Sequence, residues 1–297
     1  MPREVPLIKL NNGVDMPLLG LGVWDASAQE TVGAVSCAIS SGYRLIDTAK
    51  AYRNEQQVGE GLRASGRHRS ELFITTKLFM NDFGYDRALR AFDDSLRRLG
   101  LEYLDLYLLH WPTRSWDATV QSWKALERLL AEGRVKSIGV CNFLEAHLDE
   151  LVAEAQVIPA VNQIERHPYF SQTELIAKNE SLGIVTQAWS PIGGVKNYGN
   201  WDAYGGRKDP LTDTVIVGIG EAHRKTPAQV ILRWHVQNGV IAIPKSVNPA
   251  RIAENIDVFD FTLTVAEMAQ MDALDGSMRA GPHPDSIDVD SFPHLAY

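Results

Sequence analysis

Four side chains that together support proton transfer occur in order along the chain: those of Asp47, Tyr52, Lys77 and His110. Asp47, Lys77 and His110 each end a short apolar run, and Tyr52 follows five positions after Asp47. If these runs are neighbouring strands of one parallel sheet, they lie about 5 Å apart and their carboxyl ends bring the side chains together. The spacing therefore predicts one site made of a carboxylate, a phenol, an ammonium and an imidazole.

This combination has the chemistry of a general acid. A phenol with a pKa of about 10 is a poor acid at neutral pH, but a buried ammonium beside it favours the phenolate and lowers that pKa. We expect Lys77 to act on Tyr52 in this way, with Asp47 keeping the lysine charged. A neutral His110 would orient a carbonyl oxygen. The set contains no nucleophile beside a base and no pair of histidines that indicates a metal site.

Each residue taken alone has a simpler interpretation. A carboxylate after a strand often caps a helix, a lysine at a strand end is usually solvated, and a histidine before Trp-Pro fits a core. Four such residues at or just after the ends of successive strands favour a shared function over four separate structural roles.

Eight apolar runs alternate with segments of helical periodicity. The runs are continuous, which is typical of parallel strands buried on both faces. This pattern predicts an α/β fold, a (β/α)8 TIM barrel. An open doubly wound sheet is the alternative, but no Gly-x-Gly-x-x-Gly follows an early strand. The expected strands are residues 18–23, 43–48, 72–77, 103–110, 135–142, 160–165, 184–191 and 240–246.

Further elements complete the predicted barrel. Asn12-Gly13 suits a tight turn, so residues 7–17 are expected to form an N-terminal β-hairpin plug. Residues 193–209 are long for a connection and are expected to form a lid, with Trp201 or Tyr204 closing over a ligand. Residues 1–297 are expected to form a single domain with extra C-terminal helices. The expected helices are residues 27–40, 54–64, 85–99, 120–131, 144–155, 172–182, 213–224, 227–239, 248–255 and 264–274.

The composition argues against several classes of protein. The 297 residues carry a net charge of -8, which is unlike a nucleic-acid binder. The two cysteines, Cys37 and Cys141, form neither a disulfide framework nor a Cys-x-x-Cys zinc motif. The chain starts without an apolar signal core, and no apolar run reaches the ~18 residues of a membrane span. We therefore expect a cytoplasmic protein without a metal, nucleic acid or membrane partner. We also expect a monomer, although the composition does not determine the oligomeric state.

Nine segments, taken in order, resemble the aldo-keto reductases over essentially the whole chain. They include DLYLLHWP at 105–112 and IPKSVNPARIAENIDVFDF at 243–261. The short connection after Pro112 and the short tail are most similar to the bacterial branch that includes the 2,5-diketo-D-gluconate reductases. The nine segments are residues 18–24, 43–62, 74–78, 105–112, 138–143, 162–169, 187–191, 225–234 and 243–261.

The resemblance implies an NADPH-dependent, reversible reduction of aldehydes and ketones to alcohols. Hydride would pass from nicotinamide C4 to the carbonyl carbon of a small molecule, while Tyr52 donates the proton. Asp47, Tyr52, Lys77 and His110 match the catalytic tetrad of the family. Trp24 and Trp111 match its substrate-pocket walls, beside Tyr52 and His110, and Phe79 and Tyr169 are expected to add to the wall.

The resemblance also assigns the cofactor contacts by motif. Asn142 and Gln163 would hold the nicotinamide carboxamide, and Trp189 would stack on the ring. Lys245 and Arg251 would take the 2′-phosphate, and two such cations suit a phosphate clamp. The complete expected set, through the pyrophosphate segment to the adenine contacts, is Cys141, Asn142, Gln163, Trp189, Ser190, Pro191, Ile192, Gly193, Lys245, Ser246, Val247, Arg251, Glu254 and Asn255.

Three departures from the family pattern qualify this prediction. Cys141 stands where a serine is usual, which weakens or removes one hydroxyl contact to the carboxamide. Lys50 either biases the mouth towards anionic substrates or is simply solvated. The glycine-rich stretch 215–220 replaces a more helical sequence and leaves its local fold open.

Two other functions stay open. Lys77 could form a Schiff base in a lyase or isomerase on the same barrel, although the phenol and the Lys245/Arg251 clamp argue against this. A non-catalytic, cofactor-sensing subunit is the other alternative, and the complete tetrad argues against it.

Overall fold

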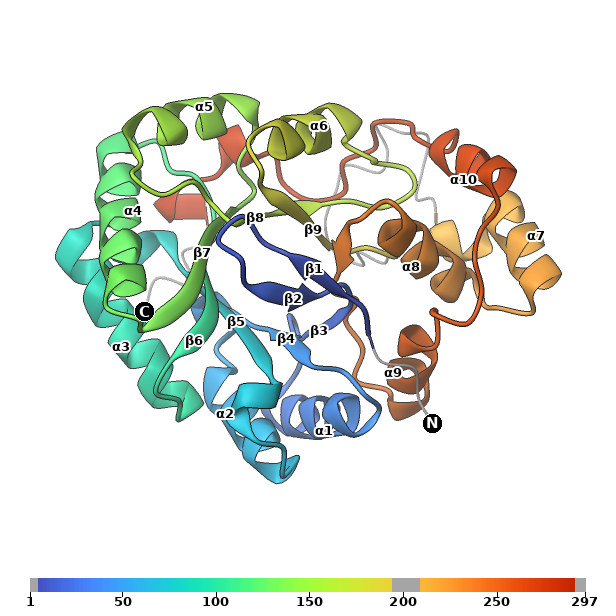
Figure 1. The fold of residues 1–297 in the computed structure, drawn as a ribbon, viewed down its shortest axis with the longest axis horizontal. Coiled ribbons are helices and arrows are strands. Elements are labelled where there is room, and N and C mark those ends of the chain that lie inside the picture. Colours follow the sequence, from blue (N-terminus) through green and yellow to red (C-terminus); the bar gives the residue numbers. More distant parts are fainter. Residues whose placement is uncertain (1–4, 194–208, 292–297) are drawn as a thin grey trace.

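The computed structural model describes residues 5–193 and 209–291 and is built on a sheet of eight parallel strands (Figure 1). Each strand pairs with the next in sequence. Bridges from Leu19 to Ala242 and from Gly22 to Lys245 join the first strand to the last and close the barrel. The predicted (β/α)8 fold is therefore confirmed. The strands are β3 (Gly20–Gly22), β4 (Leu45–Asp47), β5 (Phe73–Leu78), β6 (Leu104–Leu109), β7 (Val135–Cys141), β8 (Val161–Glu165), β9 (Val185–Trp189) and β10 (Ile241–Ala242).

Helices surround the barrel (Figure 1). Capping boxes at Ser27, Thr226 and Thr264 fix three helix starts. The glycine-rich stretch 215–220 is helical, and the Asp213 side chain caps that helix by accepting from the Val215 N–H. The helices are α1 (Ala28–Ser40), α2 (Glu55–Ala64), α3 (Tyr85–Leu99), α4 (Trp116–Ala131), α5 (Glu145–Glu154), α6 (Thr173–Ser181), α7 (Thr214–His223), α8 (Pro227–Gln237), α9 (Pro249–Ile256) and α10 (Val265–Asp272).

Two predicted boundaries were wrong by four residues, whereas the others differ from the structure by no more than two. Helix α4 begins at Trp116 and not at residue 120, because the Trp116 ring packs against Phe143 and His147 and extends the helix. Strand β10 covers two residues and not the whole of 240–246, since Pro244 has no N–H to continue the ladder.

The N-terminal hairpin closes one end of the barrel, as predicted. Strands β1 (Leu7–Lys9) and β2 (Asp15–Pro17) pair antiparallel. Leu10 and Met16 are buried in the same apolar cluster as side chains from β4, β6, β8 and β10. The Asn12 amide donates to the Lys136 carbonyl, near the start of β7, at 2.9 Å. The hairpin therefore covers the N-terminal ends of the strands and leaves their C-terminal ends for the site.

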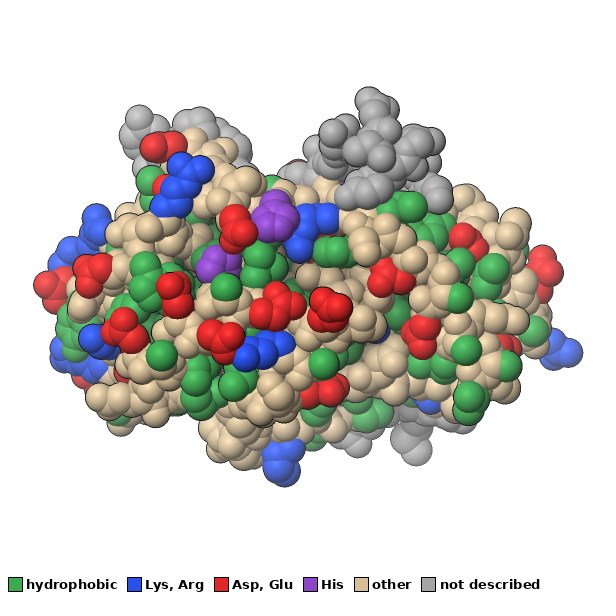
Figure 2. Space-filling model, turned by 90° about the horizontal axis from the view of Figure 1, so that it is seen from above, with side chains coloured by type: hydrophobic (Ala, Val, Ile, Leu, Met, Phe, Trp, Pro, Cys, Tyr) green, Lys and Arg blue, Asp and Glu red, His purple; other side chains and the backbone are tan. Residues whose placement is uncertain are grey.

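The surface carries charges of both signs, and the segment after β9 lies largely outside the described residues. Asp and Glu are interspersed with Lys and Arg on the face shown in Figure 2. No helix in the described part of the chain is long and apolar enough to cross a membrane. The predicted lid at 193–209 falls almost entirely on residues 194–208, which lie outside the described residues.

Candidate active site

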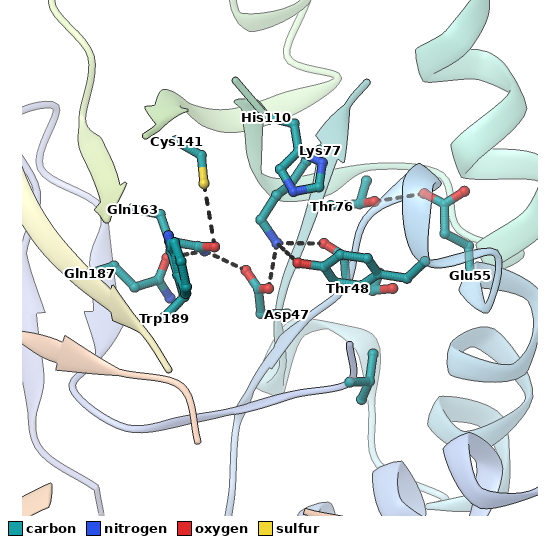
Figure 3. Close-up of polar contacts among 12 residues, drawn as sticks. Asp47, Thr48, Glu55, Thr76, Lys77, His110, Cys141, Gln163, Gln187 and Trp189 are labelled. Atoms are coloured by element: carbon teal, nitrogen blue, oxygen red, sulfur yellow. Dashed lines mark hydrogen bonds and ion pairs between the residues drawn. The ribbon is translucent and has the colours of Figure 1, made fainter. Parts of the chain in front are cut away.

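The ammonium of Lys77 is the centre of the site. It is fully buried on β5 and donates to Asp47 Oδ1 at 2.5 Å, to the Thr48 carbonyl at 2.9 Å and to Tyr52 Oη at 3.4 Å (Figure 3). These three bonds occupy all three N–H donors of an ammonium. Asp47 pairs in register with Thr75 of β5, two residues before Lys77, so strand alternation turns the lysine to the same side as Thr75.

The two charges of this pair stabilise each other inside the barrel. Burial by itself lowers the pKa of Lys77, but the Asp47 carboxylate and Tyr52 raise it further than burial lowers it. Burial raises the pKa of Asp47, while the Lys77 charge and hydrogen bonds from Lys77 and Gln163 oppose that rise. The pKa of Asp47 stays above its ordinary value because burial outweighs these bonds, which favour the carboxylate form. The raised pKa of Lys77 keeps the ammonium charged, as expected.

Tyr52 departs from the expected electrostatics. It ends a 3-10 turn, Lys50–Tyr52, directly after β4. Burial raises the pKa of Tyr52 more than the Lys77 charge lowers it, and the pKa is raised to about 12. The expectation of a lowered pKa is therefore wrong for the protein without ligand, because the loss of water outweighs the ammonium. The phenol is protonated at neutral pH and holds a proton to donate.

His110 lies beside the phenol as a neutral ring. Its ring centroid is 5.7 Å from that of Tyr52 and 5.9 Å from that of Phe79, both edge to face. Burial, and then the Lys77 charge, hold the pKa of His110 well below its usual value. Nδ1 is buried and has no hydrogen-bond partner in the described structure. Nε2 is therefore the nitrogen left to meet a substrate.

Gln163 connects the tetrad to the next strands of the barrel. Its amide donates to Asp47 Oδ2 at 2.8 Å and to Gln187 Oε1 of β9 at 2.8 Å. The Cys141 thiol lies 3.7 Å from Gln163 Oε1 (Figure 3). A residue expected to hold the cofactor carboxamide is thus hydrogen-bonded to the Asp47 carboxylate.

Asn142 forms a second link, from His110 to Trp189. It follows β7 with a positive φ of 64°. Its amide nitrogen donates to the His110 carbonyl at 3.1 Å, and its oxygen accepts from the Trp189 indole at 2.8 Å. The structure therefore brings Trp189 and both predicted carboxamide-binding residues to the tetrad.

The segment after β9 is a tight turn. The Gly193 N–H donates to the Ser190 carbonyl at 2.9 Å, with Pro191 and Ile192 between them. Ser190 is left-handed at φ 47°, and a Cβ on Gly193 would lie 2.7 Å from Pro210 Cγ. The turn is thus fixed by packing that requires glycine at its end.

The predicted phosphate pocket lies between β10 and α9. Lys245 donates to the Asp25 carbonyl at 3.0 Å, and Arg251 is exposed on the first turns of α9. Neither forms a salt bridge with a carboxylate among the described residues, although the Lys245 charge acts on the Glu30 carboxylate at longer range. Ser246 and Val247 form the connection before the helix.

The expected adenine contacts are only partly available. The Glu254 carboxylate accepts from the Thr226 hydroxyl at 2.8 Å, so it also supports the start of α8. Asn255 is buried. Both residues lie on α9, beside the predicted phosphate pocket, but the Glu254 carboxylate is already bonded to Thr226, the residue that caps α8.

The apolar wall beside His110 is larger than expected. Trp111 stacks on the imidazole, with centroids 6.4 Å apart. Met80 and Ile287 join Phe79 and Trp111 in one buried cluster. Ile287 carries no sequence signal, because it reaches the site from the C-terminal segment through packing. The position of Gln187 could have been found from the sequence, because it is a polar residue inside an apolar run, as Gln163 is.

Three other residues singled out in the sequence are Trp24, Lys50 and Tyr169, and each has a different environment in the structure. Trp24 follows β3 and is 39% exposed. Lys50 is partly exposed and forms an ion pair with Asp82, so a carboxylate offsets part of its charge at the mouth of the site. The Tyr169 hydroxyl donates to Asp213 at 2.8 Å, which ties it to the start of α7.

Comparison with known proteins places this geometry in a family. The family model described as Aldo/keto reductase family matches residues 18–276. Morphine 6-dehydrogenase of Pseudomonas putida is 67% identical over 98% of this chain and 99% of its own. The methylglyoxal reductase DkgA of Escherichia coli K12 is 47% identical over 95% and 98%. The crystal structure of a Bombyx mori aldo-keto reductase in complex with NADP superposes with a TM-score of 0.87, at 36% identity over 98% and 97% of the two chains.

The buried pair generates a stability prediction. Lys77→Met leaves the Asp47 charge buried without its partner and should lower the free energy of unfolding by about 3–5 kcal/mol. The double variant Asp47→Asn/Lys77→Met removes both charges and should recover at least about 1 kcal/mol of that loss. Urea unfolding of the three proteins measures this. Equal losses in the single and double variants would contradict a charged pair.

Proposed function

The chain belongs to the aldo/keto reductase family, and we propose that it reduces aldehydes and ketones with NADPH, with Tyr52 as proton donor. The observation that carries this proposal is the coordination of Lys77. Its ammonium reaches Asp47, the Thr48 carbonyl and the Tyr52 hydroxyl together. This arrangement holds a protonated phenol next to a positive charge, which stabilises the phenolate that remains after proton transfer.

The chain's own groups divide the work around the carbonyl. The neutral His110 offers Nε2 to the carbonyl oxygen and orients it towards Tyr52. The Tyr52 O–H donates its proton to that oxygen as negative charge develops there. Lys77, fixed by Asp47, stabilises the tyrosinate until a proton returns from solvent. The cluster containing Trp111 and Phe79 excludes water from one side of this path.

The residues present fit an NADPH molecule. Lys245 and Arg251 are cations that form no salt bridge in the described structure, and two such cations suit a phosphate site. Trp189, Asn142 and Gln163 stand next to the tetrad, where a nicotinamide ring and its carboxamide would be held. When bound, NADPH supplies hydride from nicotinamide C4 to the carbonyl carbon. The named residues all belong to one chain, so we propose that the site is complete in a monomer.

The two alternative functions fit less well. A Schiff base needs a neutral lysine amine that reaches the substrate, whereas Lys77 is fully buried, charged and bonded through all three donors. A non-catalytic sensor has no need of a protonated phenol beside a buried ammonium. The reductase therefore accounts for more of the site.

The names of the relatives suggest test substrates. One relative is named as a reductase of methylglyoxal and another as a dehydrogenase of morphine. The same site can run in either direction, since Tyr52 can accept in oxidation the proton that it donates in reduction. We propose small aldehydes and ketones for reduction and cyclic secondary alcohols for oxidation.

Tyr52→Phe removes the proton donor and keeps the ring. We expect kcat for methylglyoxal reduction to fall by about 10²–10⁴-fold, because general acid catalysis contributes that much, while NADPH affinity stays near that of the parent protein. NADPH oxidation assays and fluorescence titration measure the two quantities. Tyr103→Phe, which removes a hydroxyl at the other end of the barrel, is the control with parent activity. Full activity of Tyr52→Phe would refute the assignment.

Arg251→Ala tests the phosphate pocket. Loss of a charge-assisted hydrogen bond costs about 1.5–3 kcal/mol, so the Kd for NADPH should rise about ten- to a hundredfold. The Kd for NADH, which lacks the 2′-phosphate, should change little. Arg97→Ala on the exposed face of α3 is the matched control. Equal losses for both cofactors would exclude a 2′-phosphate contact.

A further inference from the structure

A buried arginine that forms no direct salt bridge among the described residues lies beside the end of β9. Arg166 follows β8 and is 3% exposed. Its Nε donates to the Ser171 carbonyl at 3.1 Å, and one terminal nitrogen lies 2.7 Å from His235 Nδ1. Its guanidinium carbon lies 3.8 Å from the centroid of the Trp234 ring. It forms no salt bridge in the described part of the chain.

The arginine determines which nitrogen of His235 carries a proton. A guanidinium has donors only, so His235 Nδ1 must accept its hydrogen bond. The neutral ring then carries its proton on Nε2. That nitrogen lies 3.0 Å from the Pro191 carbonyl and donates to it. Burial, and then the charge of Arg166, hold the pKa of His235 well below its usual value, so the ring stays in this neutral form.

The Pro191 carbonyl belongs to the turn from Ser190 to Gly193. This turn carries a left-handed serine, a conformation that costs of order 1 kcal/mol and persists only where the surroundings hold it. Through this bond, a side chain of α8 holds the middle of the turn. The rest of α8 packs both on the barrel core, through Leu232, and on the cluster that contains Trp234. The bond therefore ties the end of β9 to this helix.

A role in stability alone accounts poorly for this arrangement. Burying an arginine without a direct salt bridge is costly, and an apolar residue at the same place would usually be at least as stable. Burial lowers the pKa of Arg166, and Asp272 and Asp275 oppose this. What the arginine supplies, and an apolar residue does not, is a fixed tautomer of His235 and so a fixed direction for its N–H.

We propose that Arg166 and His235 form a buried clamp that fixes the Ser190–Gly193 turn, and that they are positioning residues for cofactor binding. The proposal rests on the proposed function in one respect, that this turn lies along the cofactor's phosphates. The clamp touches neither substrate nor the tetrad. Its loss therefore acts on cofactor affinity and leaves the proton-transfer step unchanged.

Two substitutions at one position separate the clamp from the fold. His235→Leu fills the space but can neither accept from Arg166 nor donate to Pro191. His235→Gln offers an acceptor and a donor and restores both bonds. Ile231→Val shortens a buried apolar side chain that lies one turn earlier on the same helix and makes neither bond of the clamp, and it is the control for general destabilisation.

The first experiment compares the Kd for NADPH with kcat at saturating NADPH in each variant. His235→Leu should raise the Kd for NADPH about tenfold, which corresponds to one lost hydrogen bond, with kcat at saturating NADPH within about twofold of the parent value. His235→Gln and Ile231→Val should bind NADPH like the parent. Parent-like affinity in folded His235→Leu would overturn the proposal, and so would weakening of equal size in Ile231→Val.

Two readouts need neither cofactor nor activity. Nitrogen-15 spectra of the imidazole should show the proton of His235 on Nε2, and a proton on Nδ1 would overturn the clamp even if His235→Leu does not fold. Amide hydrogen exchange at Gly193 should be faster in His235→Leu than in the parent and the glutamine variant, and unchanged exchange would overturn the clamp. If the parent protein fails to bind NADPH, the proposed function fails, while the tautomer and exchange results still decide the clamp.

Discussion

The burial of one charge organises this protein. An ammonium without access to water is tolerated only where its donors meet oxygens and a carboxylate balances its charge. Lys77 meets that condition because β4 and β5 are neighbours in register and the chain after β4 turns back at once to present Thr48 and Tyr52. The same condition restricts the position of the phenol, so the requirement that stabilises the lysine also places the acid.

The barrel extends this constraint to the cofactor side. Gln163 forms hydrogen bonds with both Asp47 and Gln187. Asn142 forms hydrogen bonds with the backbone of His110 and with the indole of Trp189. A displacement of the tetrad would therefore disturb the residues proposed to hold the nicotinamide. On the far side, the clamp through His235 ties the next turn of the chain to α8. The site is thus a set of bonded strand ends and not a group of independent side chains.

Much of this was predictable because the signals are local. The alternation of apolar runs and helical segments predicted the barrel, and the polar groups at the ends of those runs predicted the tetrad. The Asn12-Gly13 turn predicted the hairpin. Contacts between distant segments were not predictable: Ile287 in the apolar cluster with Trp111 and Asp82 beside Lys50 have no local pattern. The pKa of Tyr52 was predicted with the wrong sign, because its value depends on how completely packing removes water, which residue types alone do not reveal.

The pKa of Tyr52 tests the account most directly. In protein labelled with carbon-13 at the tyrosine ring, the Tyr52 resonance is the one that disappears in Tyr52→Phe. Since burial raises the pKa of Tyr52 to about 12, this resonance should keep the chemical shift of a neutral phenol up to about pH 11. A titration midpoint at or below about 10, the ordinary tyrosine value, would contradict the account, because the ammonium and not burial would then dominate the site.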